Sequence, residues 1–278
     1  EGSHAGHDVI KKDHAIEYLT KRGHRDAVEY LNQITVPKTQ VSFMGCSSET
    51  CSNRTEFGAI VNGILDRMAE TERKSNVIVI DSDLEGSTGL NAIRKAHPEV
   101  CINGGVQERG NFSAAAGFGF EKGRQGIFST FSAFLEMIIS EATMARLNDA
   151  NVICHFSHAG VDDIADNTCH FGINVFLAHS GLPEGDKTRL YFAADALQLK
   201  AIVETIWNDE GVRYVFTTRS KVPYILKSDG SKFFGEGYTF VRGKDEVIRE
   251  GKAGYVVSYG EMLYRSLDAV ERLRQEGL

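Results

Sequence analysis

The feature that most constrains this sequence is an alternation of short apolar runs with longer segments of helical periodicity. The runs lie at 77–80, 152–156 and 214–216, and the helical segments include 54–68, 133–147 and 195–207. A strand buried on both faces needs such a run, and a helix that covers a sheet needs such a period. The alternation predicts an α/β fold with a doubly wound, mainly parallel sheet and helices on both faces.

Composition and charge exclude several classes of partner. The formal net charge of -7 provides no overall positive field that would attract nucleic acid or an anionic membrane. The sequence has no run of about 18 apolar residues, as a membrane-spanning helix would need. Its 5 cysteines show no CxxC spacing, which favours reduced thiols. We therefore expect a cytoplasmic protein with no nucleic-acid and no membrane partner.

Three regions of the chain differ in pattern. Residues 1–51 are polar and are expected to form an N-terminal arm or linker. The regular alternation occupies residues 52–227, which we expect to be the main domain. Two strands and one helix are expected beyond it, at 238–242, 255–257 and 261–274. Residues 228–278 are therefore interpreted as a linker and the opening of a second α/β unit, which is expected to be incomplete because it cannot close a sheet by itself.

Common enzyme motifs are missing or misplaced. Gly117, Gly119 and Gly123 end a predicted helix instead of following a strand, so they do not form a dinucleotide-binding loop. Neither a P-loop nor a GxSxG sequence is present. A zinc site is the alternative role for Cys154, His155, His158, Cys169 and His170. It is not predicted, because neighbouring residues of a strand point to opposite faces of the sheet.

A glutamate stands at the start of a helix rich in small residues. Residues 106–111 read VQERGN, follow INGG and precede AAAG. The segment resembles the one that reads GVREHAM or GIAEQNM in the transketolase family. The resemblance implies that Glu108 is a catalytic and cofactor-binding residue that contacts the aminopyrimidine of thiamine diphosphate, where a carboxyl group promotes the shift to the imino form. Without the resemblance, Glu108 would be a first-turn carboxylate favoured by the helix dipole.

Two phenylalanines follow a predicted strand. Residues 129–134 read STFSAF, which resembles the family's STFxxF turn between a strand and a helix. The resemblance implies that Phe131 and Phe134 bind the cofactor by enclosing its pyrimidine ring. Their spacing of three places both rings on one helical face, as contacts with a flat heterocycle require. A tyrosine often found three residues later in the family is Met137 here. The alternative is that both rings belong to the ordinary core.

A histidine-rich segment follows the next strand. His158, Asp166 and His170 have the spacing of the family's THDSxGxGEDGPTH loop. The resemblance implies that all three contact sugar hydroxyl groups and that His158 and His170 also move protons, which suits imidazole near neutral pH. The loop here has lost the glycines and the proline of the family pattern, so the substrate identity stays open.

Two arginines and a serine complete the resemblance. Arg54, Ser87 and Arg219 fall where the family places its contacts with the sugar phosphate. Guanidinium groups recognise phosphate through paired hydrogen bonds, so two arginines suit one terminal phosphate even in an acidic protein. Taken singly, each arginine would be an ordinary surface or ion-pair residue.

Together the four segments imply the pyrimidine-binding half of a transketolase. Such an enzyme transfers a two-carbon ketol unit from a ketose phosphate to an aldose. The family's GDG…N segment, which holds the diphosphate through Mg²⁺ or Ca²⁺, has no counterpart in this sequence. We therefore expect no metal ligand in this chain, a diphosphate-binding domain or subunit as its partner, a homodimer or larger assembly, and no activity of the chain alone.

Two other readings stay open. The first is another thiamine enzyme, of the 2-oxo acid dehydrogenase β type or the deoxyxylulose phosphate synthase type. The second is a noncatalytic module that keeps this fold for dimerisation or regulation, because a fold does not determine function.

Overall fold

The computed structural model describes residues 11–35, 41–161, 170, 172–173 and 185–278. The chain divides after Ser42 into two compact units. The first unit contains two antiparallel helices, α1 (Lys12–Lys21) and α2 (Arg25–Gln33), joined through Gly23 with a φ of 76°. No residue of either helix is fully buried.

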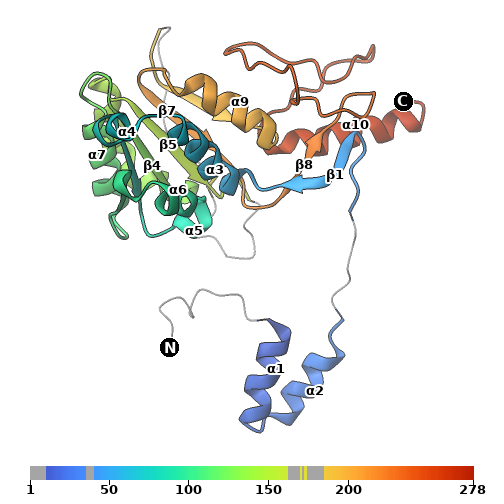
Figure 1. The fold of residues 1–278 in the computed structure, drawn as a ribbon. Coiled ribbons are helices and arrows are strands. Elements are labelled where there is room, and N and C mark those ends of the chain that lie inside the picture. Colours follow the sequence, from blue (N-terminus) through green and yellow to red (C-terminus); the bar gives the residue numbers. More distant parts are fainter. Residues whose placement is uncertain (1–10, 36–40, 162–169, 171, 174–184) are drawn as a thin grey trace. The chain divides into compact units, whose positions relative to one another are not determined.

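The second unit is built on a six-stranded sheet (Figure 1). All neighbouring strands are parallel, and their spatial order is β3-β2-β4-β5-β7-β6. The strands are β2 (Val77–Asp81), β3 (Cys101–Asn103), β4 (Gln125–Phe131), β5 (Val152–Ser157), β6 (Arg189–Phe192) and β7 (Val212–Phe216). The predicted parallel α/β sheet is confirmed. The apolar runs of the sequence form β2, β5 and β7, and the central strands β4, β5 and β7 are buried along their whole length.

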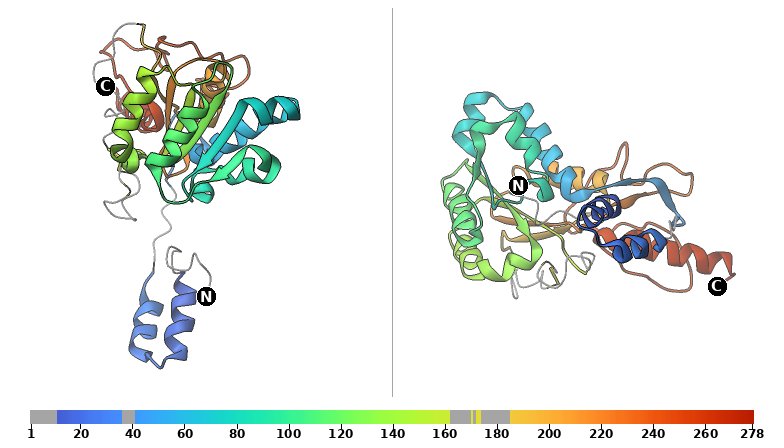
Figure 2. Two further views of the ribbon diagram at one scale, coloured as in Figure 1. Left: turned by 90° about the vertical axis from the view of Figure 1, so that its left-hand side faces the viewer. Right: turned by 90° about the horizontal axis from the view of Figure 1, so that it is seen from below.

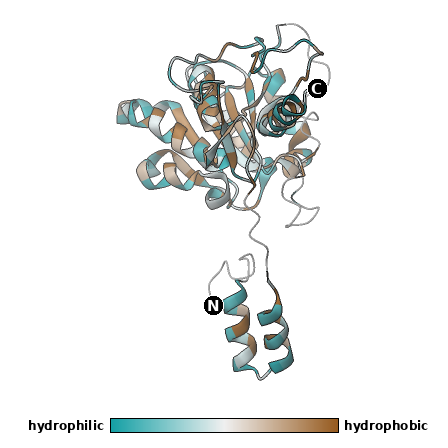
Figure 3. Cartoon of the chain, turned by 90° about the vertical axis from the view of Figure 1, so that its right-hand side faces the viewer, coloured by the Kyte–Doolittle hydropathy of each residue, from teal (hydrophilic) through white to brown (hydrophobic). Residues whose placement is uncertain are grey.

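Helices cover both faces of this sheet (Figure 2). One face packs against α3 (Asn53–Asp66), α6 (Asn91–Ala96) and α9 (Ala196–Ile206). The other face packs against α7 (Glu108–Phe118), the 3₁₀ helix η2 (Ser132–Ile138) and α8 (Ile139–Leu147). The remaining short helices are α4 (Glu70–Asn76), α5 (Glu85–Thr88) and η1 (Pro98–Val100). The predicted doubly wound arrangement is therefore present, and the most hydrophobic ribbon lies in the central strands (Figure 3).

A smaller antiparallel sheet lies beside the main one. It pairs β1 (Cys46–Cys51) with β8 (Val222–Ile225) and packs against α10 (Leu263–Gln275) through a third apolar cluster. The 3₁₀ helix η5 (Gly260–Met262) directly precedes α10. The strands expected at 238–242 and 255–257 are wrong, since both segments are irregular. Tyr255 and Val257 are 100% and 92% exposed, so within the described residues no neighbouring strand completes a ladder there.

The helices are too short or too polar for a membrane. Within the residues that the structure describes, none combines the length and the hydropathy that a membrane-spanning segment requires.

Candidate functional site

Most of the predicted site residues lie where strands of the main sheet end. Phe131 is the last residue of β4, His158 follows β5 directly, and Arg219 lies three residues beyond β7. Ser87 lies in α5, after β2, and Glu108 opens α7, after β3. Because the carboxyl ends of parallel strands share one edge, this arrangement matches the usual ligand-binding side of such a sheet.

Glu108 is a buried acidic residue at a helix start. It is 3% exposed, and within the described residues its carboxyl group has no hydrogen-bond or ion-pair partner. The adjacent Arg109 pairs instead with Glu141, at 2.6 Å. A carboxyl group without a partner in this position suits a hydrogen-bonding group brought by a ligand or another chain. Val106, two residues earlier, is 78% exposed, which leaves this edge of the molecule open.

Four rings gather at the end of β4. Phe131 and Phe134 stack with their centroids 5.9 Å apart and an interplanar angle of 19°. The rings of His158 and His170 lie 3.9 Å and 5.0 Å from that of Phe131. Phe131 is the extended residue that precedes the 3₁₀ helix η2, and Phe134 lies within that helix. The structure thus joins the predicted aromatic pair with both predicted histidines.

His158 has an unusual backbone conformation. Its φ of 60° lies in the left-handed region, which costs a non-glycine residue on the order of 1 kcal/mol and is common at functional sites. Its Nδ1 lies 2.9 Å from Oγ of Ser157, and the side chain is 4% exposed. Two residues on, the amide of Gly160 donates to the carbonyl of Gly172, at 2.9 Å. Asp166 lies outside the described residues.

Arg54, Ser87 and Arg219 are brought together. Arg54 Nε donates to the carbonyl oxygen of Arg219 at 3.2 Å, and its Nη1 donates to the carbonyl oxygen of Ser87. Both acceptors are carbonyl oxygens, and the two hydrogen bonds fix the position of the Arg54 guanidinium group. A residue of α3 therefore links the segments that follow β2 and β7.

His155 has a structural role in the site that the sequence did not predict. It is fully buried in β5, its Nδ1 is 3.0 Å from Ser129 Oγ, and its Nε2 is 2.9 Å from Thr217 Oγ1. Its ring also stacks on Phe57 of α3 at 4.2 Å. Burial, together with the nearby His158 and Arg54, lowers the pKa of His155 to about 3.

The imidazole of His155 is therefore neutral near pH 7, so one hydroxyl group donates to the ring and the other accepts from it. Its partners Ser129 and Thr217 each lie two residues before a predicted site residue, Phe131 and Arg219. The ring thus connects the ends of three strands beneath the site. The only sequence signal for it is a polar residue inside an apolar run.

Asp81 is a second buried polar residue at this edge. Its Oδ2 accepts hydrogen bonds from the amides of Leu84 and Glu85, at 2.8 Å and 3.1 Å, and so fixes the start of the helix that carries Ser87. Its Oδ1 is buried and has no partner within the described residues. Burial raises the pKa of Asp81 to about 6.

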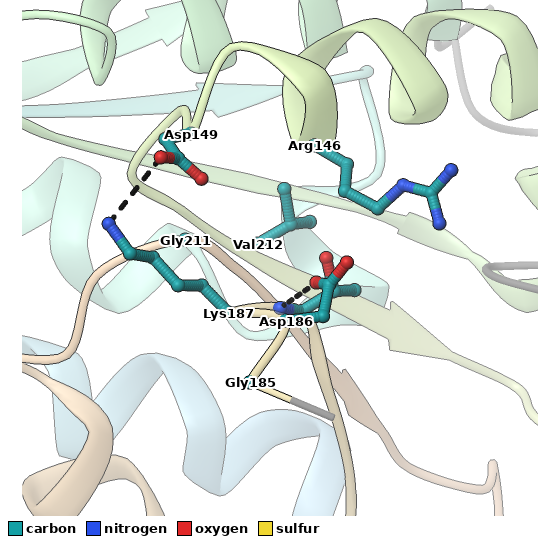
Figure 4. A pocket seen from close by; sticks show the side chains of 8 residues that line it. Arg146, Asp149, Gly185, Asp186, Lys187, Gly211 and Val212 are labelled. Atoms are coloured by element: carbon teal, nitrogen blue, oxygen red, sulfur yellow. Dashed lines mark hydrogen bonds and ion pairs between the residues drawn. The ribbon is translucent and has the colours of Figure 1, made fainter. Parts of the chain in front are cut away.

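A cavity at the opposite edge of the sheet does not belong to this site. It measures about 220 Å³ and lies at the amino ends of β5, β6 and β7 (Figure 4). Its lining mixes both signs of charge, and Lys187 is paired with Asp149 at 3.5 Å and Glu210 at 2.9 Å. Among the residues described, no three His, Cys, Asp or Glu side chains are placed to hold a metal ion. Cys154 and His155 pack on opposite faces of the sheet.

Comparisons with known proteins agree with this geometry. The family model described as transketolase, pyrimidine binding domain, matches residues 58–224, more than half of the chain. The chain is 26% identical over 209 residues to transketolase-like protein 2 of Mus musculus, covering 74% of this chain and 32% of that protein. It is 27% identical over 223 residues to a putative uncharacterized transketolase family protein of Sinorhizobium fredii, covering 76% of this chain and 58% of that protein.

Among solved structures, one titled "Split gene transketolase, inactive beta4 tetramer" superimposes with a TM-score of 0.64 at 26% identity. The match covers 83% of this chain and 70% of that one. The chain thus spans about a third to somewhat over half of the two curated relatives.

Proposed function

The chain belongs to the transketolase pyrimidine-binding domain family, and we propose that it supplies the pyrimidine-binding half of a thiamine diphosphate-dependent ketol transferase. The reaction would move a two-carbon unit from a ketose phosphate to an aldose. The observation that carries the proposal is the buried residue Glu108, whose carboxyl group has no partner within the described residues and which stands on a helix that packs against η2.

The residues of this site fit the pyrimidine of the cofactor. When bound, thiamine diphosphate would supply the electron sink for cleavage of the carbon–carbon bond. Glu108 would hold a proton between its carboxyl group and the pyrimidine nitrogen, an interaction that would compensate its burial. Phe131 and Phe134 would enclose the flat ring, and their stacked geometry shows that they already share one orientation.

The remaining residues would act on the substrate. His158 and His170 lie against Phe131, so they stand next to the proposed cofactor position and would move protons to and from sugar oxygens. Asp166 would bind a sugar hydroxyl group. Arg54, Ser87 and Arg219 would hold the terminal phosphate, as their mutual contacts support.

We propose that the diphosphate and its Mg²⁺ or Ca²⁺ are held by a different domain or subunit. The sequence contains no GDG tripeptide, and Ile102 and Val106 near Glu108 are 49% and 78% exposed, as expected for residues that another chain would cover. The structural neighbour titled as a split-gene transketolase tetramer supports both a separate half and an oligomer. We propose a homodimer or a larger assembly.

The proposal is tested by isolating the chain together with its copurifying partner. Binding of thiamine diphosphate is measured by calorimetry, and ketol transfer is assayed with xylulose 5-phosphate as the donor. Both measurements are made on the wild type, Glu108→Gln and the surface control Glu121→Gln. We expect Glu108→Gln to lower turnover by about 10²-fold or more and the control to leave it unchanged. Full activity of Glu108→Gln would contradict the proposal, activity with pyruvate alone would indicate a different thiamine enzyme, and absence of cofactor binding would favour the noncatalytic module.

A further inference from the structure

Glu261 is a buried acidic residue that contacts the end of β7. It belongs to η5, is 6% exposed and lies 43 residues beyond its partner Thr218. One carboxylate oxygen accepts the backbone amide of Thr218 at 3.0 Å, and the other accepts its hydroxyl group. Two donors of one residue are therefore held by one carboxylate, which fixes both the backbone and the side chain of Thr218.

Thr218 lies between two residues, Thr217 and Arg219, whose backbone groups are hydrogen-bonded to other segments. The amide of Thr217 donates to the carbonyl of Phe156 at 3.0 Å, and the carbonyl of Thr217 accepts from the amide of Ala159 at 2.9 Å. The carbonyl of Arg219 accepts from Arg54 at 3.2 Å. Glu261 supplies the hydrogen bonds of the residue between these two. The hydrogen bonds of Glu261 therefore help to fix the backbone that leads into Arg219.

Attachment of the C-terminal helix does not require this carboxylate. Tyr264 and Leu267 of α10 are buried in the apolar cluster beside β1 and β8, and Asp268 accepts the amide of Met44 at 2.7 Å. Those contacts hold α10 in place at a distance from Thr218. A buried carboxylate is unfavourable unless its hydrogen bonds compensate it, so Glu261 adds a costly group where apolar packing already suffices.

We infer that Glu261 is a positioning residue for Arg219, through which the C-terminal segment helps to build the phosphate side of the site. The inference rests on the proposed function for the role of Arg219 itself. It assigns Glu261 of η5 to the site, in a region where the sequence analysis expected only the start of another unit.

The test compares substrates with and without a phosphate in the assembled enzyme. For Glu261→Ala we expect the KM for xylulose 5-phosphate to rise about 10-fold, the value of one lost charge-assisted hydrogen bond, while kcat/KM for unphosphorylated xylulose changes less than about 3-fold. Glu261→Gln keeps an acceptor for the Thr218 amide and should give a smaller rise. Asp268→Ala is the matched control: it loses a bond that anchors α10, the helix that follows η5, and should lower stability without raising the KM for xylulose 5-phosphate.

Hydrogen exchange of the isolated chain gives a readout that does not need activity. Glu261→Ala should expose the Thr218 amide to exchange, and Asp268→Ala should leave it protected. If Arg219→Ala does not raise the KM for the phosphorylated sugar, the proposed phosphate role fails. The inference about Glu261 is overturned if Arg219→Ala raises this KM while Glu261→Ala and Glu261→Gln do not. It is also overturned if Glu261→Ala impairs the reaction equally with the phosphorylated and the unphosphorylated sugar.

Discussion

Replacement of His155 by glutamine should change how stability depends on pH. The folded chain holds the pKa of His155 at about 3, against an ordinary value of 6.5. Above about pH 6.5 the imidazole is neutral in both the folded and the unfolded chain. As the pH falls from there toward 3, His155 becomes protonated in the unfolded chain but stays neutral in the folded chain. The free energy of unfolding therefore decreases on acidification.

The size of the effect follows from the shift. At pH 4 the loss covers about 2.5 pH units, and at about 1.4 kcal/mol per unit it reaches about 3 kcal/mol. The glutamine amide can still bond to the hydroxyl groups of Ser129 and Thr217 but cannot stack on Phe57, so His155→Gln should cost about 1–2 kcal/mol at pH 7. The variant lacks this titrating group and does not lose stability in this way, so its free energy of unfolding should overtake that of the wild type at about pH 5–6 and exceed it by about 1–2 kcal/mol at pH 4.

Urea unfolding of both proteins at about pH 7 and pH 4 measures this difference. Other titrating groups are common to the two chains and largely cancel in the comparison. A gap between wild type and variant that stays constant to within about 0.5 kcal/mol would refute the idea that His155 is kept neutral by burial.

Asp81→Asn should show the opposite trend, because burial raises the pKa of Asp81 from 3.8 to about 6. The wild type loses up to about 3 kcal/mol as the pH rises from about 4 to 6, and the variant should gain that amount relative to it; urea unfolding across this range checks the sign. Gly58→Ala should destabilise the chain by about 1–3 kcal/mol, because its Cβ would lie 1.9 Å from the carbonyl oxygen of Gly89. Gly63→Ala, in the same helix with nothing within 4 Å, should stabilise it by up to about 1 kcal/mol, and thermal unfolding showing the reverse order would contradict the packing of α3.

The main sheet was predictable because its central strands carry their own signal. β2, β5 and β7 are largely apolar runs buried on both faces, and such runs have few other solutions in a folded chain. β1, with the sequence CSSETC, has no such pattern and became a strand because β8 pairs with it from about 170 residues away. The segment 255–257 shows the converse: its residues favour a strand, but a strand forms only beside a neighbour.

The candidate site was predictable where spacing along the chain carries the information. Phe131 and Phe134 are three residues apart, and the structure places their rings parallel. Spacing along the chain could not reveal the role of Glu261. Its partner Thr218 follows β7, 43 residues earlier, and the residues around Glu261 are those of an ordinary helix start. Residues that touch the ligand leave a local pattern, whereas residues that hold those residues are defined only by the tertiary fold.

The winding of η2 affects how the rings of Phe131 and Phe134 lie relative to each other. In a 3₁₀ helix, with 3.0 residues per turn, a residue returns to the direction of the one three positions before it, whereas at 3.6 residues per turn it lags by about 60°. Because η2 runs directly into α8, the same seven residues could continue that helix, and the segment would shorten by about 3.5 Å. Phe131 belongs to the end of β4 and Phe134 to η2, so a change in the winding of η2 would move one ring relative to the other.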